Sequence, residues 1–137
     1  MSTNSKEEEA VQLPGTPGCN SCHYLMVQTR NTFRKAQSIC RKCYRGNLVS
    51  THNRLFDNWI SCWARRINQA KLWLGVIIKL WCLWKKYCWI DGSSWNFTNW
   101  ARWQPTFGNG HCIALSTTGG RWRRAPCKRR LPFICSY

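Results

Sequence analysis

The sequence predicts a single α+β domain, in which one strand and two helices are followed by short antiparallel strands and a long loop. Three observations support this fold class. Apolar residues recur at helical spacing in two segments of the first half, short runs of β-branched and aromatic residues fill the second half, and the 137 residues include ten cysteines. A chain of this length holds one core and is too short for two domains of ordinary size. We therefore expect one α+β domain with covalent crosslinks.

The first 18 residues differ in composition from the rest of the chain. They are polar and acidic, and Pro14, Gly15, Pro17 and Gly18 follow the charged part. We expect residues 1–18 to be a disordered acidic tail and residues 19–137 to form the folded domain. The written N-terminus has no basic region followed by an apolar run, so no secretory signal peptide is visible in it.

Two helices are predicted in the first half of the domain, after a strand at residues 24–28. Asn31 or Thr32 provides an N-cap for the first helix. Its apolar residues recur every three or four positions and are Phe33, Ala36, Ile39 and Cys40. The second helix is predicted to cover residues 54–66. Its expected apolar face consists of Leu55, Trp59, Ile60 and Trp63.

The second half of the domain favours short strands, because β-branched and aromatic residues dominate it. The predicted strands cover residues 72–77, 87–90, 112–115, 122–127 and 133–136. Residues 91–110 show no regular period and are predicted to form a long loop, which in a compact domain is usually functional or held by a disulfide. The longest apolar stretch, residues 72–83, is shorter than the roughly 20 residues that a membrane-spanning helix needs.

The charge of the domain is strongly positive. Apart from Lys6 and the three glutamates of the tail, the chain has 20 basic side chains and only two acidic ones, Asp57 and Asp91, which gives residues 19–137 a net charge of +18. Self-repulsion of this size destabilises a compact state, so we expect crosslinks and a polyanionic partner. Glycosaminoglycans, nucleic acids and anionic membranes all fit this charge.

The cysteines allow two interpretations. More than 7% cysteine in a small chain favours an oxidising compartment and disulfides. The pairs Cys19-x2-Cys22 and Cys40-x2-Cys43, however, are separated by 17 residues, which lies in the spacing range of a four-cysteine zinc ribbon. The alternative hypothesis is therefore a zinc-binding, basic nucleic-acid-binding module of the nucleus or cytosol.

The sequence from about residue 22 to residue 137 resembles the C-type lectin domain in the order and spacing of several segments. These are Trp73-Leu74-Gly75-Val76, Trp89-Ile90-Asp91-Gly92-Ser93, Trp100 with Pro105, Cys112, residues 122–127 and Pro132-Phe133-Ile134-Cys135. The resemblance implies a C-type lectin-like fold with two helices, short antiparallel strands and a long disulfide-held loop.

Three further segments are similar to one branch of that family, the eosinophil major basic protein or bone marrow proteoglycan branch. They are residues 43–50, residues 91–97 and Gly119-Gly120-Arg121-Trp122-Arg123-Arg124. Residues 80–89, rich in Trp and Cys, are more similar to the proteoglycan 3 paralogue. In this branch an acidic pro-segment masks the basic domain before release, and the resemblance implies that Glu7-Glu8-Glu9 is a remnant of one.

The resemblance also implies two disulfides, Cys40–Cys135 and Cys112–Cys127. It opposes the zinc hypothesis, because it assigns Cys40 to a disulfide. The remaining cysteines have no pairing that is shared across the family, and they are Cys19, Cys22, Cys43, Cys62, Cys82 and Cys88. A disulfide between Cys82 and Cys88 is geometrically possible.

Calcium-dependent sugar binding in this family uses carboxylate and amide oxygens at two places. The matching residues here are Gln104-Pro105-Thr106 and Trp122-Arg123-Arg124. Calcium needs several oxygen ligands, usually with carboxylates, and two arginines would repel it. We therefore expect no metal and no cofactor.

The same arginines favour sulfated glycans such as heparin and heparan sulfate, because guanidinium groups suit sulfate oxygens. The predicted glycan-binding residues are Arg102, Arg121, Arg123, Arg124, Lys128, Arg129 and Arg130. On a strand, Arg121 and Arg123 share one face and Arg124 lies on the other. Non-specific binding of nucleic acid to the same surface stays open.

The ten tryptophans fall into two groups. Trp73, Trp89, Trp100 and Trp122 lie where the lectin fold uses tryptophan in its core. Trp81, Trp84, Trp95 and Trp103 lie in loop-like segments, and basic residues surround Trp81, Trp84 and Trp103 in particular. An amphipathic surface of this kind suits an anionic membrane interface.

No set of nucleophile, base and orienting residue can be assembled from the few acids and histidines, so we expect no enzymatic activity. Asn96-Phe97-Thr98 is an N-glycosylation sequon. The sequence thus predicts a calcium-independent, cationic C-type lectin-like protein, secreted or stored in granules. By resemblance, we expect it to bind heparin-like glycans and anionic membranes as a cytotoxic immune effector.

Overall fold

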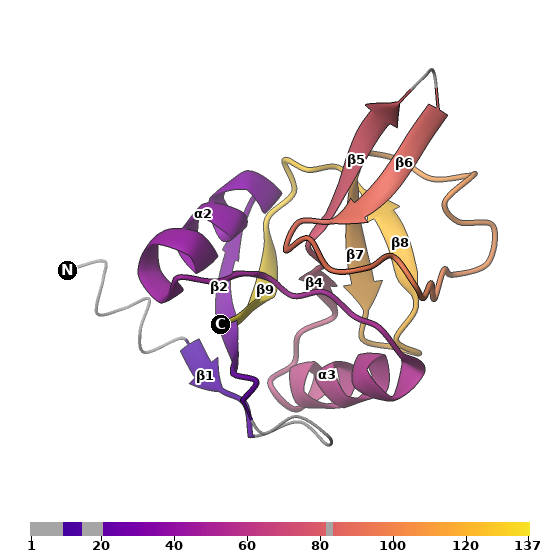
Figure 1. Cartoon of the computed structure of the whole chain (residues 1–137). Helices are drawn as coiled ribbons and strands as arrows, with labels where there is room; N and C mark the ends of the chain where they lie inside the picture. The colour runs from indigo at the N-terminus through magenta and orange to yellow at the C-terminus, as the bar shows by residue number, and fades with distance from the viewer. Residues whose placement is uncertain (1–9, 15–20, 82–83) are drawn as a thin grey trace.

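Figure 1 shows the computed structural model of the chain, which describes residues 10–14, 21–81 and 84–137. It contains two helices, α2 (Phe33–Tyr44) and α3 (Arg54–Arg66). The strands are β1 (Ala10–Gln12), β2 (Tyr24–Asn31), β3 (Asn47–Leu48), β4 (Lys71–Trp73), β5 (Val76–Trp81), β6 (Trp84–Trp89), β7 (Cys112–Ser116), β8 (Trp122–Ala125) and β9 (Leu131–Ser136). The predicted α+β class is confirmed.

The main sheet runs in the order β1-β2-β9-β4-β7-β8. β3 pairs with Cys135 and Ser136 of β9, on the edge that β4 pairs with at Phe133. Its pairs are antiparallel, except that β4 meets β9 in parallel at Trp73 and Phe133. The first and last long strands therefore lie side by side, with Tyr24 opposite Ser136. β5 and β6 form a separate two-stranded hairpin that projects beyond the main sheet in Figure 1.

Helix α2 begins and ends at clear signals. The side chain of Thr32 accepts a hydrogen bond from the backbone of Lys35, and Arg45, in the left-handed conformation, ends the helix. The buried side includes Ala36 and Cys40. Cys40 forms a disulfide with Cys135 on β9, with 5.3 Å between the Cα atoms. A bond that closes a loop of this length is worth about 4 to 5 kcal/mol in the chain-entropy model.

Helix α3 has the predicted bounds, residues 54–66. Asn53 caps it by accepting a 2.7 Å hydrogen bond from the backbone of Phe56. Ile60 and Ala64 are fully buried, but Leu55 is 68% exposed, so its predicted place on the core face is wrong. The buried residues of α3 recur at three- and four-residue spacing from Asp57, and Leu55 lies off that face of the helix.

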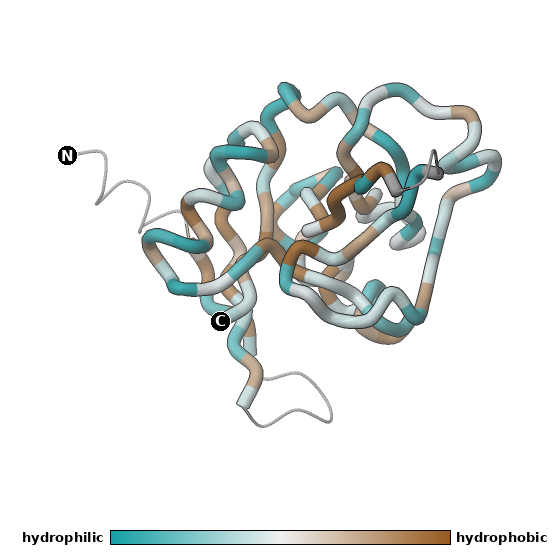
Figure 2. The backbone as a smooth tube through the Cα atoms, turned by 45° about the horizontal axis from the view of Figure 1, so that its top comes forward, coloured by the Kyte–Doolittle hydropathy of each residue, from teal (hydrophilic) through white to brown (hydrophobic). Residues whose placement is uncertain are grey.

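The core lies between the helices and the sheet, and Figure 2 shows the most hydrophobic backbone segments in the interior strands. Trp73 and Trp122 are completely buried. The indole nitrogen of Trp73 donates a 2.8 Å hydrogen bond to the carbonyl of Asn31, which satisfies its one polar atom. Within the described residues, no helix has the length and apolar character needed to cross a bilayer.

Two sequence predictions need correction. Disorder throughout residues 1–18 is wrong at Ala10–Gln12, which pairs with β2, and Leu13 is 4% exposed. The single strand predicted at residues 72–77 is divided between β4 and β5. The division falls at Gly75, where a Cβ atom would lie 2.6 Å from the carbonyl oxygen of Leu48. Only glycine allows this close approach, so the chain leaves one sheet there and enters the other.

Candidate functional site

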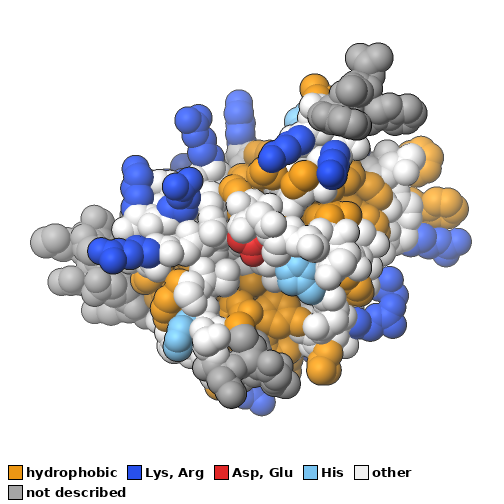
Figure 3. Space-filling view, in the orientation of Figure 1, with side chains coloured by type: hydrophobic (Ala, Val, Ile, Leu, Met, Phe, Trp, Pro, Cys, Tyr) orange, Lys and Arg blue, Asp and Glu red, His pale blue; other side chains and the backbone are white. Residues whose placement is uncertain are grey.

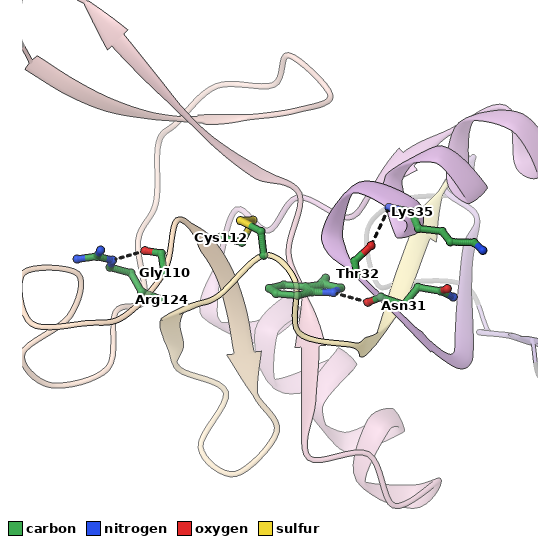
Figure 4. The surroundings of a disulfide bond; sticks show 8 residues. Asn31, Thr32, Lys35, Gly110, Cys112 and Arg124 are labelled. Carbon is green, nitrogen blue, oxygen red and sulfur yellow. Dashed lines mark hydrogen bonds between the residues drawn. A yellow bond between two sulfur atoms is a disulfide. The ribbon is translucent and has the colours of Figure 1, made fainter.

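The long loop between β6 and β7 meets β8 at Arg124. The guanidinium Nε of Arg124 donates a 2.8 Å hydrogen bond to the carbonyl of Gly110, which Figure 4 shows near the Cys112 disulfide. A second guanidinium nitrogen donates to the carbonyl of Pro105 at 3.1 Å. The half-buried Arg124 side chain thus joins two points of the loop to the sheet.

Gln104 completes this connection. Its side-chain oxygen accepts a 3.0 Å hydrogen bond from the backbone of Arg124, and its amide nitrogen donates to the carbonyl of Phe107. The space is tight, because a Cβ atom at Gly108 would lie 2.6 Å from the Gln104 oxygen. Behind the loop, Cys112 and Cys127 form the second disulfide that the resemblance implied.

This is the region where the resembling family coordinates calcium. Here its centre holds a guanidinium group, which supplies positive charge and donors to loop carbonyls, and no carboxylate among the described residues contacts it. Asp57 and Asp91, the acids of the described chain, bond to other groups. In the described parts of the chain, no three histidine, cysteine or acidic residues gather as metal ligands.

The predicted glycan-binding residues differ in exposure and lie on separate segments. Arg121 and Arg123 are exposed at β8, as the alternation predicts, while Arg124 is half-buried and bonded to the loop. Lys128, Arg129 and Arg130 follow the C-terminal end of that strand. Because a strand rises about 3.3 Å per residue, Arg121 lies roughly 13 Å from Ala125, the last residue of β8.

The basic turn lies beside the start of α2 instead. The backbone of Phe33 donates a 3.1 Å hydrogen bond to the carbonyl of Cys127, and Asn31 pairs with Leu131. This contact brings the exposed turn to exposed cations of β2 and α2. We call this group the α2 basic surface, and it consists of Arg30, Arg34, Lys35, Lys128, Arg129 and Arg130. In Figure 3, blue side chains gather over the part of the molecule where Figure 1 places α2.

Arg30, Arg34 and Lys35 were not among the predicted glycan-binding residues. One signal was present: the first turn of α2 contains basic residues and no acidic one. This pattern opposes the helix dipole, which favours negative charge at an N-terminus. An uncompensated arrangement of cations is stabilised by an anion that binds there.

The predicted membrane-interface residues lie on two segments. Trp103, 64% exposed in the long loop, has the Arg102 guanidinium 5.1 Å from its ring centroid and packs edge-on against Phe107, which is 69% exposed. Trp81 and Trp84 pair at the end of the β5–β6 hairpin, so they are not in a loop, and their side chains lie outside the description. Trp95 is half-buried against Trp89 and is not an exposed loop residue.

The zinc ribbon hypothesis is wrong, because Cys40 is bonded to Cys135 and Cys22 is also in a disulfide. Cys43, Cys62 and Cys88 are free thiols in this structure. A Cys82–Cys88 bond is therefore not formed here, and Cys88 pairs with Ile77 across the hairpin. Cys19 and Cys82 lie outside the described residues.

Asp57 is completely buried beneath the long loop. One of its oxygens accepts hydrogen bonds from the amide of Asn99 at 2.9 Å and the indole of Trp122 at 3.1 Å. The other oxygen has no hydrogen-bond partner among the described residues. Burial raises the pKa of Asp57 to about 6, although the hydrogen bonds oppose this shift.

Asn96 of the glycosylation sequon is exposed on the long loop. Its side-chain oxygen lies 2.9 Å from Nδ1 of His52, and the other ring nitrogen of His52 lies 3.2 Å from the Ser50 hydroxyl. These contacts use the amide oxygen of Asn96. The amide nitrogen, to which a glycan would be attached, has no hydrogen bond to the described residues.

Comparisons with known proteins agree with this geometry. The family model "Lectin C-type domain" matches residues 29–137. The chain is 55% identical to Proteoglycan 3 of Mus musculus over 132 residues, which cover 96% of this chain and 59% of that protein. It is 41% identical to Eosinophil granule major basic protein 2 of Cavia porcellus over 134 residues, 96% of this chain and 57% of the other.

The fold is also similar to that of human lithostathine, with a TM-score of 0.76 at 22% identity over 93% of this chain and 96% of that one. The chain spans about three fifths of the length of the curated relatives named above. The chain belongs to the C-type lectin domain family, in the branch that contains proteoglycan 3 and the eosinophil major basic proteins.

Proposed function

We propose that this protein binds heparin-like sulfated glycans through its α2 basic surface, without calcium. The observation that carries the proposal is the hydrogen bond between Phe33 and Cys127, which brings two basic segments far apart in sequence to one exposed surface. Six cations there have no acidic neighbour in the first turn of α2. Sulfate groups along a glycan chain would relieve their mutual repulsion.

Calcium independence is supported by Arg124. In the region where related lectins place the metal, its guanidinium donates to the carbonyls of Gly110 and Pro105. The loop is therefore connected to the sheet by a side chain that is always charged. A divalent cation would compete with this group at close range and would find no carboxylate to balance its charge.

The second part of the proposal is action on anionic membranes. Trp103 and Phe107 form an exposed aromatic pair, and Arg102 lies against the Trp103 ring. Arginine beside interfacial aromatic rings suits a negatively charged lipid surface. Together with the granule name of one relative, this supports a secreted or granule-stored cytotoxic immune effector, for which Asn96 is an accessible glycosylation site.

The glycan proposal is tested by the salt dependence of heparin binding. Replacing Lys128, Arg129 and Arg130 with glutamine should lower the slope of log affinity against log salt by about two to three units, at roughly 0.7 to 0.9 per lost ion pair on the nucleic-acid scale. The matched control removes the same charge from the hairpin, where Lys79, Lys85 and Lys86 are also exposed. The control should change the slope by less than one unit.

Two outcomes would reject this assignment. Equal slopes for both triple variants would mean that heparin responds to net charge and not to a surface, as non-specific nucleic-acid binding also does. Loss of heparin binding in a chelator would mean that a metal takes part. The parent protein with and without chelator should give the same affinity.

A further inference from the structure

A cavity of about 580 Å³ lies between the start of β2, the first turn of α3 and the C-terminal residues, away from the α2 basic surface. This volume is in the usual range of small-molecule sites. No lysine or arginine is among the residues that line it, although the chain contains 21 of them. A positively charged ligand in this cavity therefore meets no basic side chain of Lys or Arg in the lining.

One wall of the cavity is aromatic. Tyr24, Phe56 and Trp59 pack together with ring centroids 5.2 to 5.9 Å apart. On the C-terminal side, His23 and Tyr137 are stacked at 5.5 Å. In Figure 3, orange hydrophobic side chains lie between pale blue histidines on the face shown. Aromatic faces attract cations, with the strongest effect for cations that are weakly hydrated.

Asp91 contributes a carboxylate to the same cavity. The Ser50 hydroxyl donates to one of its oxygens at 2.6 Å, and the backbone and hydroxyl of Ser93 donate to the other. Partial burial acts to raise the pKa of Asp91, but these hydrogen bonds and the nearby charge of His52 outweigh burial and keep the pKa below its ordinary value. The carboxylate is thus ionised at neutral pH.

Asp91 can give a ligand a negative charge but few free hydrogen-bond acceptors. Three donors already occupy its two oxygens, so little acceptor capacity is left for a ligand that must donate hydrogen bonds. A primary ammonium carries three donors and is strongly hydrated. A quaternary ammonium carries none, and its methyl groups can pack against the aromatic wall.

From these contacts we infer that the cavity is a binding site for a quaternary ammonium group, such as the choline of a phosphocholine head group. The trimethylammonium group lies against Tyr24, Phe56 and Trp59, with Asp91 balancing its charge. The site is independent of the proposed glycan surface, since the two share no residue.

The test uses the full-length, disulfide-bonded chain labelled with ¹⁵N. Tetramethylammonium should shift the indole signal of Trp59 and the amide signals of Leu55 and Phe56, and leave the buried indole of Trp73 unchanged. Methylammonium, which has the same charge, should bind at least about tenfold more weakly because its donors lack acceptors. Equal affinity of the two cations would overturn the inference.

Asp91→Asn should weaken tetramethylammonium binding about fivefold to tenfold, since it removes the charge and retains the shape. The matched control is Thr118→Lys, which raises the net charge by the same amount at an exposed turn between β7 and β8. Trp59→Leu provides a second variant, which removes the aromatic face at a half-buried position. Heparin binding should be unchanged in all three. If Asp91→Asn and Thr118→Lys have the same effect, the carboxylate is not part of a site.

The source of the head group is decided by two ligands. Soluble phosphocholine and vesicles of pure phosphatidylcholine are compared for the parent and for Asp91→Asn. Binding of both, each weakened by the substitution, identifies a lipid head group. Binding of soluble phosphocholine alone identifies a free ligand. If neither shifts the Trp59 signal or binds in an Asp91-dependent way, the inference is rejected.

Discussion

Basic residues within β8 and just beyond its C-terminal end lie in opposite environments. Within the strand, Arg124 is half-buried and donates to two loop carbonyls. Beyond the strand, Lys128, Arg129 and Arg130 are exposed next to α2. A count of positive residues treats all four alike. The comparison teaches that the hydrogen-bond partners of a cation decide whether it stabilises the fold or is available to a ligand.

The largest expected effect is a difference in the free energy of unfolding between variants of Arg124 and of its neighbour Arg123. Arg124→Ala leaves the carbonyls of Gly110 and Pro105 without partners, so it should lower the free energy of unfolding by about 3 kcal/mol. Arg123→Ala removes an exposed side chain and should change it by less than about 0.5 kcal/mol. Chemical denaturation of both variants measures the difference. Similar values for the two would show that the loop does not depend on Arg124.

The same contrast holds for the two acids of the domain. Asp57 is completely buried and its pKa is raised, whereas Asp91 is only partly buried and hydrogen bonds from Ser50 and Ser93 lower its pKa. The folded state binds the proton of Asp57 more tightly than the unfolded state does. Its contribution to stability is therefore complete below the unfolded pKa of about 3.8 and is lost as the pH rises through about 6.

Asp57→Asn should remove this dependence. From pH 4 to pH 7 the parent should lose roughly 2 to 3 kcal/mol through Asp57, and the variant should keep that stability because a neutral amide replaces the buried carboxylate. Thermal unfolding at a series of pH values measures this dependence. Asp91→Asn is the control, because the pKa of Asp91 is lowered and its contribution to stability is lost as the pH falls. A parent and an Asp57→Asn protein with parallel pH profiles would contradict a raised pKa.

Much of the fold follows from local sequence signals. The apolar spacing of Trp59, Ile60 and Trp63 predicts α3 at its observed bounds, although Leu55 was wrongly placed on the same face. The division of β4 from β5 could not be predicted in this way, because Gly75 is required by its contact with Leu48, a residue far away in the chain. β1 was missed because its polar and acidic surroundings are typical of disorder.

The candidate site shows the same limit. The sequence identifies Arg123 and Arg124 as a change at the metal position, yet it cannot show which of them turns inward to the loop. It also identifies the basic residues of the turn. That this turn lies next to Arg34 could not be predicted, because it depends on the contact between Phe33 and Cys127. The cavity beside Asp91 has no local signal, because its walls come from four separated parts of the chain.

A smaller effect is expected at the membrane. Replacing Trp103 and Phe107 with serine removes the exposed aromatic pair of the long loop, and should reduce dye leakage from anionic vesicles about tenfold while heparin affinity stays within twofold. Trp81→Ser with Trp84→Ser is the comparison on the hairpin. If neither pair lowers leakage in a folded protein, charge alone disturbs the bilayer.

The smallest expected effect compares one basic residue within β8 with one in the basic turn beyond it. Arg129→Gln removes a cation of the α2 basic surface, and Arg123→Gln removes an exposed cation from the strand itself. Both variants have the same net charge, so any long-range change in attraction is equal for the two. If heparin is bound at α2, Arg129→Gln should lower the salt slope by about 0.8 and Arg123→Gln should lower it by much less. The opposite order would move the glycan to the β8 side, where Arg121 is the neighbouring exposed cation. Because the expected change in slope is less than one unit, the slopes must be measured over a wide salt range. The two variants must first be shown to unfold at the same denaturant concentration.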